Sequence, residues 1–244
     1  MTNRQFTWAV SAALVLLGFL AYANTFSGDW VWDDVSSVLL HENVQNPAKL
    51  GQLFREDQHA FGKGEGNFYR PLVSVSFMVD FLLSYDPALD GAELKGYPDV
   101  KPFLFHLSNT LWHCTAAVLV FLLLGRLGAP RLVRSAAAVL FVLHPMHTEA
   151  VAYISGRADM MSATFILAAL LCATTDAQGG RRWAAIAFSG IFFTLGLCSK
   201  ESTMIYPVLL AVVIALRLAS TGTEANKAPW LHRAQPRSEE HTSE

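Results

Sequence analysis

The sequence predicts an all-α protein that crosses a membrane several times. Hydrophobic residues make up 52% of the 244 residues and charged residues 16%, whereas a soluble domain carries about 25% Asp, Glu, Lys and Arg. Mean hydropathy is +0.33, and several stretches approach the roughly 20 apolar residues that a helix needs to cross the hydrocarbon core. This composition excludes an intrinsically disordered chain, which would be poor in hydrophobic residues and rich in charge.

Six spans are predicted within a membrane domain that covers residues 1–219. The first span, residues 8–23, follows Arg4, and we expect it to be retained because no small-x-small cleavage pattern clearly follows it. The other five spans cover residues 103–124, 132–154, 160–174, 183–198 and 204–219.

The placement of Lys and Arg predicts a cytoplasmic N-terminus. With that orientation the inner ends of the spans hold a single acid, Asp176, against seven arginines: Arg4, Arg126, Arg131, Arg134, Arg181, Arg182 and Arg217. The long outer loop, residues 24–102, holds twelve acids and six bases. Positive charge therefore alternates across the spans as the positive-inside rule requires.

The outer loop is predicted to carry a helix of its own. Residues Pro71 to Ser84 are apolar, too short to cross the membrane and interrupted by Asp80. Such a stretch is typical of an interfacial or re-entrant helix.

The C-terminal residues differ in composition from the membrane domain. Residues 220–236 predict a polar tail. The final string RSEEHTSE, residues 237–244, looks like the translation of a sequencing-library adapter. We therefore expect residues 237–244 to be an artefact and the chain to be a fragment of a longer protein.

Ionisable residues inside or at the ends of membrane spans are costly and rarely without a role. In this sequence they concentrate on the predicted outer face. The candidates are Asp33, Asp34, Arg70, His144, His147, Glu149, Arg157, Asp159, Lys200 and Glu201. Arg and Lys can hold a phosphate, a carboxylate can act as general base, and carboxylates also stabilise a developing oxocarbenium ion. This set suits a lipid-phosphate substrate.

Structural interpretations of the same residues stay open. His106, Asn109 and His113 form one helical stripe that can serve only for hydrogen bonds between helices. Arg157 and Asp159 can form a local ion pair that closes a turn. The HxxH spacing of His144 and His147 is a weak metal signal, so we predict no metal site and keep a divalent ion as an alternative.

Five sequence runs, in this order, resemble the TMTC-like proteins. They are YANTFSGDWVWDD, YRPLVSVSF, FHLSNTLWH, HPMHTEAVAYISGRADMMSATF and LCSKEST. TMTC-like proteins carry tetratricopeptide repeats behind a membrane domain and belong to the GT-C class of polyprenyl-phosphate-sugar-dependent glycosyltransferases. The resemblance covers most of the chain between Tyr22 and Ala219. Tetratricopeptide repeats are absent from this sequence and its spans are fewer than the family's, which the expected truncation explains.

The resemblance implies a GT-C-like helix bundle and an integral-membrane O-mannosyl-type glycosyltransferase. Its donor would be a polyprenyl-phosphate-linked sugar, its acceptor a protein hydroxyl on the outer or lumenal face, and its other partner the lipid bilayer. The resemblance also implies that Asp33 or Asp34 is the catalytic carboxylate. Arg157 with Asp159, and Lys200 with Glu201, would lie near the donor phosphate.

Two other functions stay open at this point. The chain can be a transporter or flippase that binds a solute through the same groups, or a non-enzymatic membrane scaffold for C-terminal repeats. For the compartment we favour a bacterial inner membrane, with the endoplasmic reticulum as the alternative. No nucleic acid is expected as a partner, because the net charge of −2 offers no basic surface.

Overall fold

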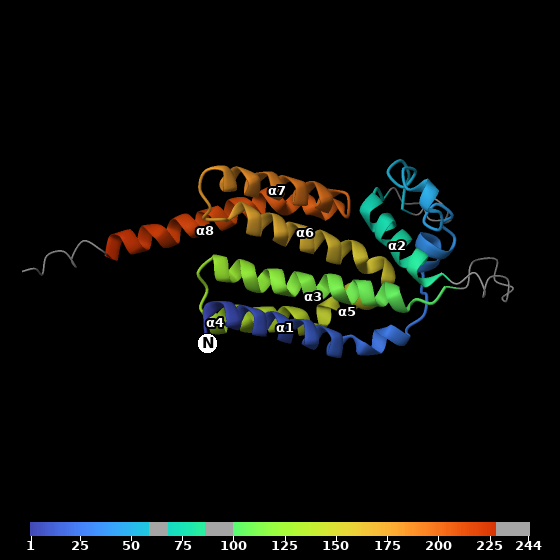
Figure 1. The fold of residues 1–244 in the computed structure, drawn as a ribbon, viewed down its shortest axis with the longest axis horizontal. Helices are drawn as coiled ribbons and strands as arrows, with labels where there is room; N and C mark the ends of the chain where they lie inside the picture. The colour runs from blue at the N-terminus through green and yellow to red at the C-terminus, as the bar shows by residue number, and fades with distance from the viewer. Residues whose placement is uncertain (59–67, 86–99, 228–244) are drawn as a thin grey trace, which may run out of the picture.

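Long helices that run up and down make up most of the structure. The computed structural model describes residues 1–58, 68–85 and 100–227, with only the helical backbone for 219–227. Figure 1 shows the long helices side by side. They are α1 (Asn3–Ala21), α3 (Phe103–Arg126), α4 (Arg131–Leu143), α6 (Arg157–Ala173), α7 (Gly180–Leu197) and α8 (Tyr206–Lys227).

Among the residues that the structure describes, four helical segments are long and apolar enough to cross a membrane. They are Asn3–Ala21, Phe103–Arg126, Ile154–Ala173 and Glu201–Leu218. The described residues contain no named strand, only one isolated bridge between Tyr85 and Val100. The prediction of an all-α polytopic membrane protein is therefore confirmed.

The segment predicted as one span over residues 132–154 is broken in the structure. Helix α4 ends at Leu143, and the chain continues through η5 (Pro145–His147), α5 (Thr148–Ala152) and η6 (Ile154–Gly156). Proline lacks an N–H and pushes the residue before it out of the helical region, and His144 is accordingly extended, with φ −68° and ψ 126°. The break leaves an irregular segment at one end of the bundle.

Basic residues gather at the opposite end. The guanidinium of Arg131, at the start of α4, hydrogen-bonds the side chain of Asn3 at the start of α1. Arg134 lies over the rings of Phe6 and Phe121, at 5.2 and 4.7 Å. Figure 1 shows the starts of α1 and α4 at the same end as the end of α3. We call this the inner end, following the predicted orientation, and the other the outer end.

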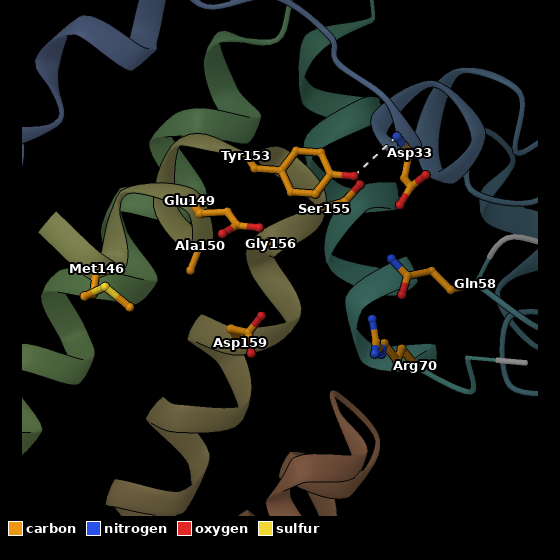
Figure 2. Close-up of a pocket in the computed structure, with 10 residues that line it drawn as sticks. All are labelled: Asp33, Gln58, Arg70, Met146, Glu149, Ala150, Tyr153, Ser155, Gly156 and Asp159. Carbon is orange, nitrogen blue, oxygen red and sulfur yellow. Dashed lines mark hydrogen bonds between the residues drawn. The ribbon is translucent and has the colours of Figure 1, made fainter. Parts of the chain in front are cut away.

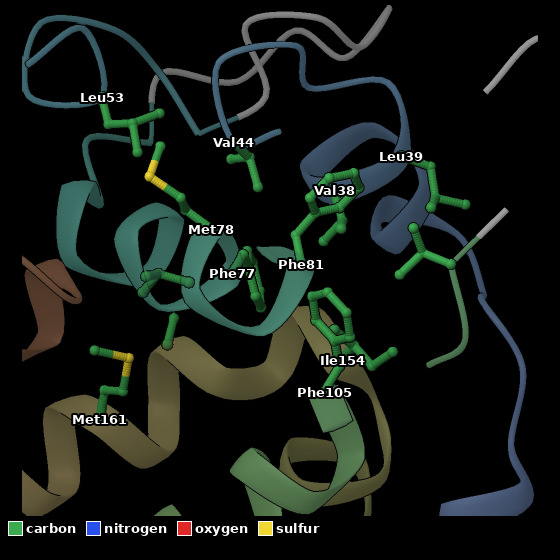
Figure 3. Packing of buried hydrophobic residues seen from close by; sticks show 13 residues of the cluster. Val38, Leu39, Val44, Leu53, Phe77, Met78, Phe81, Phe105, Ile154 and Met161 are labelled. Carbon is green, nitrogen blue, oxygen red and sulfur yellow. The ribbon is translucent and has the colours of Figure 1, made fainter. Parts of the chain in front are cut away.

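Helix α2 (Pro71–Ser84) has the predicted bounds and packs on the outer end of the bundle. It begins at Pro71, where the missing N–H costs nothing. Its buried residues Phe77 and Phe81 join Phe105 of α3 in one hydrophobic cluster (Figure 3). Figure 1 shows α2 inclined to the long helices. Its contact with a membrane surface stays a prediction.

The outer loop before α2 contributes the rest of this cluster. It contains η1 (Ala23–Ser27), the short π-helix η2 (Val35–Leu39) and η3 (Pro47–Lys49). Val38, Leu39, Val44 and Leu53 are buried against α2 (Figure 3). The loop is thus folded over the outer end of the bundle rather than extended into solvent.

The C-terminal end of the described chain runs past the predicted domain boundary. The helix η7 (Glu201–Ile205) leads into α8, and α8 continues to Lys227, beyond residue 219. The rest of the predicted polar tail and the adapter-like residues 237–244 lie outside the described residues.

Candidate functional site

A cavity of about 300 Å³ lies at the outer end of the bundle (Figure 2). It is formed where the outer loop meets the irregular segment after α4 and the first turn of α6. Its lining residues are Asp33, Gln58, Arg70, Met146, Glu149, Ala150, Tyr153, Ser155, Gly156 and Asp159. Four of the residues predicted from the sequence, Asp33, Arg70, Glu149 and Asp159, are therefore brought together.

The two adjacent aspartates of the outer loop have different environments. Asp34 is fully buried. Its Oδ1 accepts hydrogen bonds from the backbone N–H and the Oγ of Ser155, both at 2.8 Å, and its Oδ2 accepts one from the N–H of Val31 at 3.2 Å. Burial raises the pKa of the Asp34 carboxyl, and the Ser155 hydrogen bonds oppose that rise. Asp34 thus fastens the outer loop to the segment that precedes α6.

Asp33, in contrast, is exposed and lines the cavity. Its backbone N–H donates to the Oη of Tyr153 at 3.3 Å (Figure 2). The residue before it, Trp32, has a positive φ of 47°, which is uncommon for a residue other than glycine. The Trp32 ring stands edge-on to Tyr153, with the centroids 6.2 Å apart. These contacts hold the Asp33 backbone while its carboxylate stays accessible.

Two ion pairs border the cavity on the side of α6. Arg70 makes a two-pronged contact with Glu201, with Nη2–Oε1 at 2.9 Å and Nε–Oε2 at 3.4 Å. The Nζ of Lys200 lies 2.5 Å from Oδ1 of Asp159. Lys200 and Glu201 lie shortly after α7, which ends at Leu197, and each contacts a residue that lines the cavity. Both cations therefore lie at the border of the cavity, each held by an exposed acid.

Arg157 does not reach the cavity, contrary to the role that the resemblance implies. It is completely buried, and its Nη1 lies 2.6 Å from Oδ2 of Asp80 in α2. Its Nε donates to Oδ1 of Asn109 at 2.7 Å and its Nη2 to the carbonyl of Phe105 at 2.9 Å. A guanidinium engaged in this way cannot turn to a ligand without breaking a buried network. Arg157 joins α2, α3 and α6, and the predicted local pair with Asp159 does not form.

The predicted stripe on α3 contributes hydrogen bonds between helices. Asn109 donates through Nδ2 to the carbonyl of Tyr153 at 2.9 Å. The Nε2 of His113 lies 3.1 Å from the carbonyl of Val142, at the end of α4. Asn109 thereby connects α3 to the irregular segment after α4, and His113 connects α3 to the end of α4, so these two residues have a structural role.

His144 and His147 lie outside the cavity. They line a separate apolar groove of about 440 Å³ with Phe141 and Met146. The Nδ1 of His144 accepts a hydrogen bond from the N–H of Met146 at 3.2 Å. Glu149 lines the main cavity instead, and no group of three His, Cys, Asp or Glu suited to a metal occurs among the described residues.

Several lining residues were not singled out from the sequence. Tyr153 and Ser155 lie within the run HPMHTEAVAYISGRAD, so the motif contained them without marking their roles. Asp80 was noted as an interruption of an apolar helix, which is itself a signal for a buried partner. Gln58 belongs to the polar, Gly-rich stretch of residues 57–67, whose composition predicts a mobile loop and not a binding site.

Comparison with curated proteins finds several relatives that are named protein O-mannosyl-transferases. The protein O-mannosyl-transferase Tmtc1 of Drosophila melanogaster is 31% identical over 191 residues, which cover 77% of this chain and 20% of the relative. The protein O-mannosyl-transferase TMTC3 of Mus musculus is 35% identical over 156 residues, which cover 63% of this chain and 15% of the relative. TMTC3 of Homo sapiens is 29% identical over 212 residues, 82% of this chain and 22% of the relative.

This chain therefore spans about a fifth of the length of the curated relatives that it matches. No protein-family model and no solved structure matches it.

Proposed function

Because the chain belongs to the TMTC-like family, we propose that it forms part of the catalytic site of a membrane protein O-mannosyl-transferase. The relatives carry that name, and four segments of this chain can cross a membrane. The relatives named above are animal proteins, which gives no support to the bacterial inner membrane that the sequence favoured. The integral-membrane character does not depend on that choice.

The observation that carries the proposal is that an exposed acid and two cations lie around one cavity. Asp33 is exposed in the cavity, whereas its neighbour Asp34 is buried and engaged in three hydrogen bonds. Arg70 and Lys200 border the same cavity. Transfer of a sugar from a lipid phosphate needs a base for the acceptor hydroxyl and positive charge for the departing phosphate.

In the proposed reaction Asp33 is the general base. As the acceptor hydroxyl attacks the anomeric carbon of the sugar, Asp33 takes the hydroxyl proton. The new bond joins the acceptor oxygen to the anomeric carbon, and the bond from that carbon to the phosphate oxygen breaks. Its electron pair leaves with the polyprenyl phosphate. The negative charge of Asp33 also stabilises the oxocarbenium character of the transition state.

Arg70 and Lys200 are proposed to bind the donor phosphate. Each is paired with an acid, Glu201 or Asp159, whose side chain is 61% or 48% exposed. Exposed pairs of this kind are weak, so a phosphate can replace the carboxylate at modest cost. Arg70 can form two parallel hydrogen bonds to phosphate oxygens, while Lys200 acts as a point charge. This assignment replaces Arg157 by Arg70 as the main phosphate-binding arginine.

The test is sugar transfer by the intact protein in membranes. A labelled polyprenyl-phosphate mannose is supplied with acceptor protein, and incorporation of label into the acceptor is measured for wild type and for Asp33→Asn. Loss of a general base lowers transfer by about 100-fold or more. Asp29→Asn is the matched control, because Asp29 is an exposed acid in the same loop and does not line the cavity.

Normal transfer by Asp33→Asn would overturn the role of Asp33. Absence of transfer by a properly inserted wild type would overturn the proposed activity and favour a transporter or a scaffold.

A further inference from the structure

We infer that Gln58 is a sugar-binding residue of this cavity, recognising hydroxyl groups of the donor's sugar through its side-chain amide. The inference rests on the proposed function, because it takes the donor to be a polyprenyl-phosphate sugar. It adds a residue that neither the sequence motifs nor the relatives assign.

The side chain of Gln58 is buried, and no described residue forms a hydrogen bond with its amide. Its exposed fraction is 2%, and neither Nε2 nor Oε1 has a hydrogen-bond partner in the part of the chain that the structure describes. Buried polar groups in folded proteins are nearly always hydrogen-bonded, and leaving one unpaired costs free energy. An amide with both ends unpaired at a cavity wall is therefore well suited to a ligand that supplies the missing bonds.

The backbone around Gln58 is firmly held, which fixes where the amide can reach. The N–H of Gln58 donates to the carbonyl of Phe68 at 3.0 Å. The N–H of Phe68 in turn donates to the carboxylate of Asp57, and the Oη of Tyr69 donates to the carbonyl of Phe54 at 3.1 Å. These hydrogen bonds join the segment of Gln58 to Phe68, which lies two residues before Arg70 in the chain. The amide is thus positioned by its surroundings and not by bonds of its own.

Figure 2 shows the Gln58 amide directed into the cavity between Asp33 and Arg70. In the proposed reaction Asp33 lies beside the anomeric carbon and Arg70 beside the phosphate. A group between them faces the sugar that connects these two points. Gln58 is therefore placed to touch the sugar itself and not the lipid.

The chemistry of an amide also favours hydroxyl groups over a phosphate. The amide offers two N–H donors and one carbonyl acceptor. A phosphate oxygen can accept from Nε2 but has no proton for Oε1. Hydroxyl groups both accept and donate, so one or two sugar hydroxyls can satisfy both ends of the amide. Buried hydrogen bonds of this kind discriminate strongly between a sugar and an analogue that lacks the hydroxyl.

Two other glutamines of the same loop provide matched controls. Gln45 is half-buried, and its Nε2 donates to the carbonyls of Leu39 and Val38 at 2.7 and 3.2 Å. Gln45 therefore has a structural role. Gln52 is exposed and does not line the cavity. Replacement of each glutamine by Met, which is similar in length and unbranched, changes the same atoms in three different environments.

The experiment measures binding of two probes to the purified intact protein, polyprenyl-phosphate mannose and unglycosylated polyprenyl phosphate, together with the thermal unfolding midpoint. Gln58→Met is expected to weaken mannosyl-donor binding about tenfold or more and to leave polyprenyl phosphate binding unchanged. Its unfolding midpoint should not fall, because no hydrogen bond within the described chain is lost. Gln45→Met should lower the midpoint, and Gln52→Met should change neither quantity.

A second variant covers the case in which Gln58→Met folds poorly. Gln58→Asn keeps the amide but withdraws it by one methylene, and it should also weaken binding of the mannosyl donor alone. Sugar donors that each lack one hydroxyl can be combined with Gln58→Met in a double-mutant cycle, which compares the losses of binding free energy. The two losses should not add for the hydroxyl that Gln58 contacts.

The outcomes separate the inference from the proposed function. If Gln58→Met binds each probe as tightly as the wild type does, the role of Gln58 is overturned and the proposed function stands. Equal weakening of both probes would also overturn it, since the amide would then act on the phosphate or the fold. A wild-type protein that binds neither probe would overturn the proposed function and this inference together.

Discussion

Arg157 and Asp80 form an ion pair inside the outer end of the bundle, with Nη1 and Oδ2 separated by 2.6 Å. The arginine side chain is fully buried and that of the aspartate is 8% exposed. The guanidinium also lies 4.6 Å from the centre of the Phe77 ring, one turn from Asp80 on α2. This pair attaches α2 to α6, and Gly156, which precedes Arg157 in the chain, lines the cavity.

Removal of Asp80 is expected to destabilise the protein strongly. In Asp80→Ala the buried Arg157 loses its counter-charge, which costs about 3–5 kcal/mol when one partner of a buried pair is removed. The measurement is the free energy of unfolding in detergent or lipid. Asp176→Ala is the control, because Asp176 pairs with Arg217 at 2.5 Å with a side chain that is 74% exposed, and loss of such a pair costs about 0–1 kcal/mol. Similar effects of the two substitutions would contradict the structural role of Asp80.

The raised pKa of Asp34 predicts a specific dependence of stability on pH. A carboxyl whose pKa is higher in the folded state than in the unfolded state binds protons more tightly when folded. Its contribution to stability therefore falls as pH rises from the ordinary value of about 4 through the raised one.

The check is the unfolding midpoint of wild type minus that of Asp34→Asn, which does not titrate, measured across this range. This difference in unfolding midpoint should fall as pH rises. A difference that is independent of pH would contradict the raised pKa of the Asp34 carboxyl in the folded state.

Substitution of Arg70 is expected to weaken binding of the donor phosphate. Arg70→Gln removes the charge and the two-pronged geometry, and the loss of one charged hydrogen bond corresponds to about tenfold or more in affinity. Binding of polyprenyl phosphate at low and high salt measures it. Arg55→Gln is the control, since Arg55 is exposed in the same loop and does not line the cavity. If both variants lose the same affinity, general charge and not Arg70 would hold the phosphate.

Gly156 is expected to tolerate no side chain. A Cβ at this position would lie 2.7 Å from the carbonyl oxygen and 2.9 Å from the Cα of Ala150, so the backbone on one side of the cavity would have to move. Gly156→Ala should cost about 1–3 kcal/mol, as overpacking does, and should also reduce sugar transfer. Gly51→Ala is the control, because nothing lies within 4 Å of its added Cβ. A Gly156→Ala protein with normal stability would show that the backbone can move aside cheaply.

The sequence by itself determined the class of protein and several elements. Hydropathy and length are local properties, so the apolar stretches at residues 103–124 and 160–174 appear as α3 and α6 with similar bounds. The helix Pro71–Ser84 has the predicted ends because a proline starts it and the apolar run stops there. The span predicted over residues 132–154 was wrong as one helix because the backbone effect of Pro145 outweighed its hydropathy.

Only the tertiary structure decided which polar residues share the cavity. Asp33 and Asp34 are adjacent and chemically identical, and their roles differ because Ser155, far away in the chain, hydrogen-bonds one and not the other. Arg157 pairs with Asp80 and not with nearby Asp159, because the packing of α2 on α6 brings Asp80 to it. Gln58 is a candidate only because its amide lies beside the cavity without a hydrogen-bond partner among the described residues. Charge and hydropathy are properties of each residue, whereas partners and burial depend on which distant segments meet.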